Sequence, residues 1–159
     1  MRACLPSFGD FKCAHCHLLV SSAHFISGVN NRNHCPYCLW SSHLDLYAAG
    51  DRLSACKAVM KPIGLSMKTS RNKYQRHSRG ELMLIHQCTD CGALSINRIA
   101  ADDESETIRA VFHESLALGQ QMHSLCQENG IVMLKPEEAS FVYTQLYGKQ
   151  QEIRRLRWA

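Results

Sequence analysis

Three Cys-x-x-Cys pairs are the residues of this 159-residue chain whose type and spacing could do chemistry. They are Cys13/Cys16, Cys35/Cys38 and Cys88/Cys91. Two residues between the cysteines let one short turn aim both sulfurs at a single point, which is the geometry of a zinc knuckle. One such pair is weak evidence, but three pairs with a single Cys56 among them indicate metal binding.

A histidine completes the ligand count. The three pairs and Cys56 supply seven thiolates, and His43 follows the second pair at an interval that lets its ring return to the same metal. Eight ligands are enough for two closed tetrahedral sites, so we expect two zinc ions. His34 and His86 each adjoin a cysteine pair and compete for the eighth place, although we expect them to support or stack on the sites. Asp45 could orient the His43 ring.

Two divisions of these ligands between the metals remain open. In the first, the first two pairs share one metal, and His43 and Cys56 join the third pair at the other. In the second, the outer pairs share a metal, and the middle pair forms an inserted site with His43 and Cys56. The first two pairs are separated by 18 residues, the interval expected of a zinc ribbon, so spacing prefers the first division.

Composition and missing motifs narrow the class of protein. The N-terminus has no apolar signal-peptide core, and no 18-residue apolar run is present, so we expect a cytoplasmic protein with no membrane contact. Cysteines in that setting favour metal over disulfides. Cys126 is an exception, expected on the apolar face of a helix as a core residue. Four protein ligands leave no open position for substrate, and no nucleophile–base motif or phosphate loop is present, so we do not expect an enzyme.

The element pattern favours an α+β fold, a small zinc-ribbon-like β module with two metal sites followed by a C-terminal helical extension. We place the zinc-binding domain at residues 1–103 and the helical extension, with a basic tail, at residues 104–159. The turns after two cysteine pairs predict a positive φ at His17 and Gly92.

Secondary structure can be placed more finely. We expect an irregular strand over residues 53–65, broken by Pro62, and a return strand over residues 81–86. Beyond these, apolar spacing predicts one helix over residues 105–128, with an acidic start at residues 102–106. Pro136 opens a second helix.

Charge is unevenly spread along the chain. Residues 52–98 carry nine basic and two acidic side chains, a net charge of +7, whereas the whole chain carries only +4. A basic middle between neutral and acidic ends suggests a surface that meets a polyanion.

The exposed loop expected at residues 66–80 concentrates this charge. Its candidate nucleic-acid-binding residues are Lys68, Arg71, Lys73, Tyr74, Arg76 and Arg79. Basic side chains could contact phosphates while the tyrosine stacks on a base, so we expect binding to RNA or to a ribonucleoprotein such as the ribosome. The alternative is a protein-interaction adaptor in which zinc is scaffold only and the C-terminal helices dock a protein partner.

The motif Arg32-Asn33-His34-Cys35-Pro36 resembles the RNHCP domain family, which is named for these letters. The resemblance runs from about residue 11 to residue 103. The other matching segments are Cys-x-x-Cys at 13–16, the run from Cys35 to Asp45, Gly50-Asp51-Arg52, Cys56, Met60-x-Pro62, His86 to Gly92, Asn97-Arg98 and Asp102-Asp103. The family tends to have glycine where this chain has His17. The resemblance implies a small zinc-binding module and no particular activity.

Overall fold

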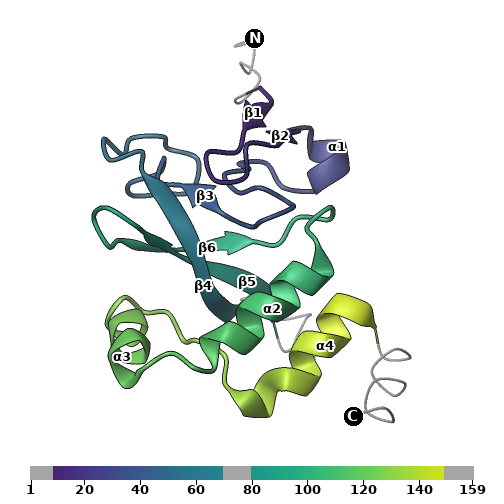
Figure 1. Cartoon of the computed structure of the whole chain (residues 1–159), viewed down its shortest axis with the longest axis vertical. Coiled ribbons are helices and arrows are strands. Elements are labelled where there is room, and N and C mark those ends of the chain that lie inside the picture. Colours follow the sequence, from purple (N-terminus) through teal and green to yellow (C-terminus); the bar gives the residue numbers. More distant parts are fainter. Residues whose placement is uncertain (1–8, 70–79, 149–159) are drawn as a thin grey trace.

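A four-stranded antiparallel sheet in the order β3-β4-β5-β6 lies at the centre of the structure, with a small ribbon of β1 and β2 beyond one end (Figure 1). The computed structural model describes residues 9–69 and 80–148. The strands are β1 (Phe11–Lys12), β2 (Leu19–Val20), β3 (Ser41–Ser42), β4 (Val59–Lys68), β5 (Glu81–Cys88) and β6 (Leu94–Arg98). The helices are α1 (His24–Ser27), α2 (Ser105–Ser115), α3 (Gln120–Glu128), the 3₁₀-helix η2 (Pro136–Glu138) and α4 (Ala139–Tyr147). The predicted α+β class is confirmed.

Helices cover both faces of the sheet. Strand β5 is buried at every position from Leu82 to His86, and alternate residues of a strand face opposite sides. Leu84 packs with Phe112 of α2 and Val142 of α4, and all three are fully buried. On the other face Ile85 packs with Cys126 of α3, which is the apolar core position predicted for that cysteine. Residues on both sides of the predicted boundary at residue 103 therefore share one core.

Strand β4 passes through Pro62, so the predicted break there is wrong. Pro62 pairs with His86 of β5, while β3 covers only Val59 and Met60 on the other edge of β4. A proline is tolerated at that uncovered edge because no ladder bond needs its missing N–H. The irregularity appears instead as a register shift between Pro62 and Gly64.

The hairpin loop is also shorter than predicted. Strand β4 continues to Lys68, and Ser66 is buried with its hydroxyl bonded to the Val132 carbonyl at 2.8 Å. Of the six candidate nucleic-acid-binding residues only Lys68 is described, exposed at the end of β4. The candidates Arg71, Lys73, Tyr74, Arg76 and Arg79 lie outside the described residues, as does the basic tail.

The single helix predicted over residues 105–128 is two helices. After Ser115 the backbone tightens, because the N–H groups of Leu116, Ala117 and Leu118 each bond a carbonyl three residues earlier. Gly119 is then extended and begins α3. In the sequence, the helical spacing of apolar residues continues across this break because both helices bury one face in the core. The prediction that Pro136 opens a helical segment is confirmed, since η2 begins there and leads into α4.

A buried ionic network joins the segment before α2 to the second cysteine pair. Asp103 accepts a hydrogen bond from Arg32 at 3.3 Å, lies 2.7 Å from His34 Nε2, and accepts the Ala100 N–H at 2.8 Å. Arg32 also pairs with Asp102 at 2.8 Å. The two aspartates predicted to start a helix therefore lie before it and hold Arg32 and His34. None of the helices in the described part of the chain is long and apolar enough to cross a membrane.

Replacing Asp103 with asparagine should reduce the free energy of unfolding by about 3–5 kcal/mol, because it removes the carboxylate that neutralises buried Arg32. Urea unfolding at a fixed metal content measures this loss. The matched control is Asp102→Asn, whose side chain is 27% exposed and should cost about 1 kcal/mol or less. Equal losses for the two variants would contradict the assigned role of Asp103.

Candidate metal centres

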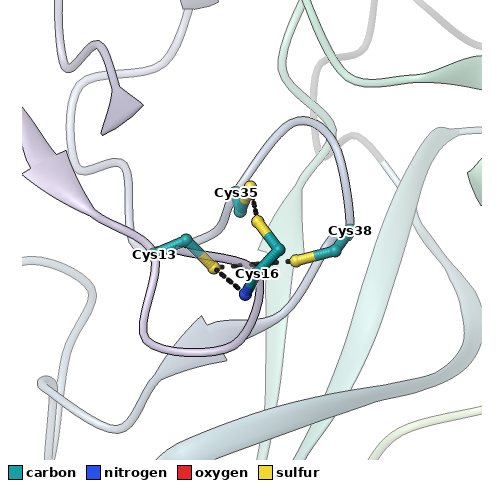
Figure 2. A group of neighbouring side chains, drawn as sticks. All are labelled: Cys13, Cys16, Cys35 and Cys38. Atoms are coloured by element: carbon teal, nitrogen blue, oxygen red, sulfur yellow. Dashed lines mark hydrogen bonds between the residues drawn. The ribbon is translucent and has the colours of Figure 1, made fainter. Parts of the chain in front are cut away.

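Four cysteines from the first two pairs converge on one point (Figure 2). The Sγ atoms of Cys13 and Cys38 are 3.6 Å apart, as are those of Cys16 and Cys35. A disulfide needs about 2.05 Å, so these sulfurs are not bonded to each other. Tetrahedral zinc with Zn–S bonds of about 2.3 Å separates its sulfurs by about 3.8 Å, which these distances approach. This first tetrad could hold a metal ion.

A second tetrad consists of His43, Cys56, Cys88 and Cys91. The Sγ atoms of Cys56 and Cys88 are 3.6 Å apart, and His43 Nδ1 lies 3.3 Å from Cys91 Sγ. All four ligand atoms lie within 4.8 Å of one another, and Cys56 and Cys91 are exposed. The structure thus brings together all eight residues singled out from the sequence, in the division that spacing preferred.

The three Cys-x-x-Cys turns share one backbone pattern. In each turn the N–H of the first cysteine bonds the carbonyl five residues later, and its own carbonyl accepts the N–H four residues later, at 2.8–3.1 Å. The residue after the second cysteine is then left-handed, with φ values of 62° at His17, 62° at Leu39 and 74° at Gly92. The predicted positive φ at His17 and Gly92 is confirmed. Leu39 occupies the same place in the second turn, a signal that could have been read from the sequence.

Cys56 has no cysteine pair, so a different turn holds it. The His43 N–H bonds the Ala58 carbonyl at 2.8 Å, and the Lys57 N–H bonds the His43 carbonyl at 3.2 Å. Lys57 is left-handed, with φ 52°. These two bonds place Cys56 beside His43 and complete the second tetrad without a local sequence motif.

The competing histidines have other partners. His86 is fully buried, with Nε2 2.7 Å from the Leu39 carbonyl and Nδ1 2.9 Å from the Asn97 amide nitrogen. Burial, followed by the nearby His34, lowers the pKa of His86 to about 3. His34 faces Asp103, as described above.

The predicted orientation of His43 by Asp45 is wrong. Asp45 instead accepts hydrogen bonds from the Asn33 amide and from the Gly50 and Arg52 N–H groups, at 2.8–3.1 Å. These bonds close the loop that follows the second cysteine pair. The spacing of residues in the sequence does not predict them.

The thiols differ in their surroundings. Burial would raise the pKa of the Cys88 thiol, but the N–H groups of Cys91 and Asp90 and the neighbouring thiols lower it to about 6. In the first tetrad burial raises the pKa of Cys35 and Cys38. Crowded sulfurs of this kind lose their protons readily when a cation supplies the opposite charge. The donor sets, Cys4 and Cys3His, are those of structural zinc sites.

A stacked ring pair ties the first two turns together. His15, inside the first pair, lies parallel to Trp40 with ring centroids 4.0 Å apart and planes 3° apart. Val20 packs beside Cys13 and Cys35, and these three are the buried members of the cluster around the first tetrad. So small an apolar cluster indicates that the tetrad, more than burial, holds the ribbon in place.

A small α+β module built on two Cys/His tetrads is the class that this fold and these sites define. The family described as the RNHCP domain matches residues 8–109, more than half of the chain, and the chain belongs to that family. Comparisons with curated proteins and with solved structures gave no match.

Replacing His17 with glycine should stabilise the protein by about 0.5–1 kcal/mol. A left-handed backbone costs an L-residue about 1–2 kcal/mol, and the greater freedom of unfolded glycine offsets part of that gain. Denaturant unfolding of metal-matched samples measures the difference. Ala14→Gly is the control, because Ala14 is exposed in the same turn without a positive φ and should lose stability. A His17→Gly protein less stable than the parent would contradict the interpretation.

Proposed function

We propose that each tetrad binds one structural Zn²⁺ ion and that the folded module binds RNA, alone or within a ribonucleoprotein such as the ribosome. Support for zinc comes from the donor sets and from sulfur separations of 3.6 Å. Four protein ligands at each site leave no position for water or substrate, so the proposed role of the metal is structural and not catalytic.

The second tetrad lies at the base of the β4–β5 hairpin. Met60 of β4 pairs with Cys88 of β5, and at the opposite end Lys68 pairs with Glu81. A metal held by Cys88 and its partners would therefore fix where β4 begins and where β5 ends, and so would stiffen the hairpin that carries the segment joining them. Stiff presentation reduces the entropy that a binding segment loses on contact with its partner.

The observation that carries RNA binding is the concentration of positive charge in that hairpin region. Residues 52–98 carry a net charge of +7, and the segment between β4 and β5 holds Arg71, Lys73, Arg76 and Arg79 in sequence. Tyr74 lies among them and could stack on a base. The adaptor alternative is less well supported, because the apolar faces of α2 and α4 are buried in the core at Phe112 and Val142.

The protein as purified should contain two zinc atoms per chain by elemental analysis. Cys35→Ser and Cys88→Ser should each lose at least one zinc and unfold at much lower denaturant, because metal binding supplies folding energy in such modules. Cys126→Ser is the control, since this cysteine is buried in the apolar core and should leave both zinc atoms bound. One zinc in the parent, or iron with visible colour, would contradict the proposal.

RNA affinity should fall with salt concentration. If four loop side chains each neutralise one phosphate of a single strand, the slope of log affinity against log salt should be about −3. Changing Arg71, Lys73, Arg76 and Arg79 to alanine should remove most of this slope while zinc content stays the same. Tyr74→Ala should weaken binding by about 1–3 kcal/mol and keep the slope.

A salt titration of the parent and both variants against structured and single-stranded RNA provides the test. Absence of binding at about 50 mM salt, where phosphate contacts are strong, would refute RNA binding. Binding that the fourfold change leaves intact would refute the assignment to this segment.

A further inference from the structure

Two hollows meet along strand β6 and form one groove. The first, of about 300 Å³, lies between residues 41–49 and residues 93–97. The second, of about 410 Å³, lies between residues 29–31 and the end of the sheet that holds Lys68 of β4 and Arg98 of β6. Ala49, Ile96 and Asn97 line both hollows, so the two adjoin along β6, and we treat them together as one groove.

The groove walls carry polar groups of two kinds. Hydroxyl and amide side chains, including Ser42, Ser95 and Asn30, occur in both hollows beside apolar side chains such as Leu44 and Ile96. The cations Lys68 and Arg98 lie at one end. Arg98 pairs with Glu81 at 2.7 Å, but both side chains are about half exposed, and such pairs yield easily to a competing anion. In the opposite hollow the Asp45 carboxylate is occupied by the bonds that close its loop.

An exposed aromatic ring lies on a rigid loop at the rim. Tyr47 lines the first hollow and is 85% exposed. The Asp51 carboxylate accepts the N–H groups of Leu46, Tyr47, Ala48 and Leu53 at 2.8–3.0 Å. Those backbone bonds hold the pKa of Asp51 well below its usual range. Because the loop is constrained in this way, the Tyr47 ring would lose little entropy on stacking against a planar group.

We infer that this groove binds a short stretch of single-stranded RNA. Tyr47 stacks on a base, the hydroxyl and amide side chains contact base edges and ribose hydroxyls, and Lys68 and Arg98 contact phosphates. Aromatic stacking beside a cationic track is the usual means of holding a single strand. The inference rests on the proposed RNA binding and adds to it a second contact surface, distinct from the segment between β4 and β5.

An extended protein segment is the other class of occupant for a groove along an edge strand. It is less favoured here, because the cations Lys68 and Arg98 suit phosphates and the exposed Tyr47 ring suits a base. A protein partner therefore enters only as an outcome of the test.

The test uses the full-length, zinc-loaded protein and a fluorescent oligouridine of about ten nucleotides, within the usual site size of single-strand binders. Tyr47→Ala should weaken binding about five- to 150-fold with the salt slope unchanged, and Tyr47→Phe should restore it. Arg98→Gln should reduce the magnitude of the slope by about 0.7, the contribution of one phosphate. Glu81→Gln should increase the magnitude of the slope, because it removes the carboxylate that competes with phosphate for Arg98.

Phe25→Ala is the matched aromatic control, since Phe25 on α1 is 90% exposed and lines neither hollow. It should bind RNA like the parent, and all variants should keep the parent's zinc content and melting temperature. Tyr47→Ala binding equal to the parent, while the fourfold loop variant loses affinity, would overturn the groove and leave the proposed function standing. Equal losses for Tyr47→Ala and Phe25→Ala would also overturn it. A parent that binds no RNA would overturn both proposals and leave the groove to a protein partner.

Discussion

Sulfur atoms gathered as closely as these repel one another once they are ionised. Two thiolates 3.6 Å apart repel by about 1 kcal/mol in water and by about 5 kcal/mol at an effective dielectric constant near 20. A cation among them reverses the sign of the interaction. With Cys13, Val20 and Cys35 as the buried residues of its small cluster, the ribbon of β1 and β2 would depend on such a cation. The ribbon and the first cysteine turn thus have little apolar support of their own, while the sheet and helices share a larger apolar core.

The second cysteine turn connects these two regions. Leu39 takes its left-handed backbone from the turn, yet its side chain is fully buried in the main core. Its carbonyl also lies 2.7 Å from the fully buried His86 ring of β5. Arg32 and His34, just before the turn, meet Asp103 just before α2. The first tetrad is therefore joined to the sheet by the side chain and carbonyl of Leu39, and to the segment before α2 by Arg32 and His34, so a disturbance of one region would reach the other.

The sequence could predict the ligands because metal geometry imposes short, regular spacing. The pairs and the positive φ at His17 followed from residues within one turn, and the preferred division followed from the 18-residue interval between the first two pairs. The Asp103 network could not be predicted in the same way, because Arg32 and Asp103 are 71 residues apart and meet only in the folded chain. The break at Gly119 was not predicted for a different reason. Apolar spacing shows which residues are buried, but it does not show whether one helix or two helices bury them. The strand break predicted at Pro62 was wrong because a strand accepts proline at an edge that no other strand covers, and the sequence does not show which edge is covered.

A metal ion with four protein ligands would have no open position for a substrate. Any function would then lie on the protein surface whose structure the ion supports. His43 belongs to the second tetrad and also lines the groove beside β6, and Cys88 of the same tetrad pairs with Met60 at the base of the hairpin. If the hairpin segment and the groove both contact RNA, one metal ion supports both surfaces. Loss of that ion would then splay the hairpin base and remove a groove wall together, so RNA affinity would follow zinc occupancy at the second tetrad even though the metal touches no RNA. Cys56 and Cys91 are exposed, whereas each cysteine of the first tetrad is at least partly buried, so the tetrad closest to both surfaces is also the more accessible to chelators.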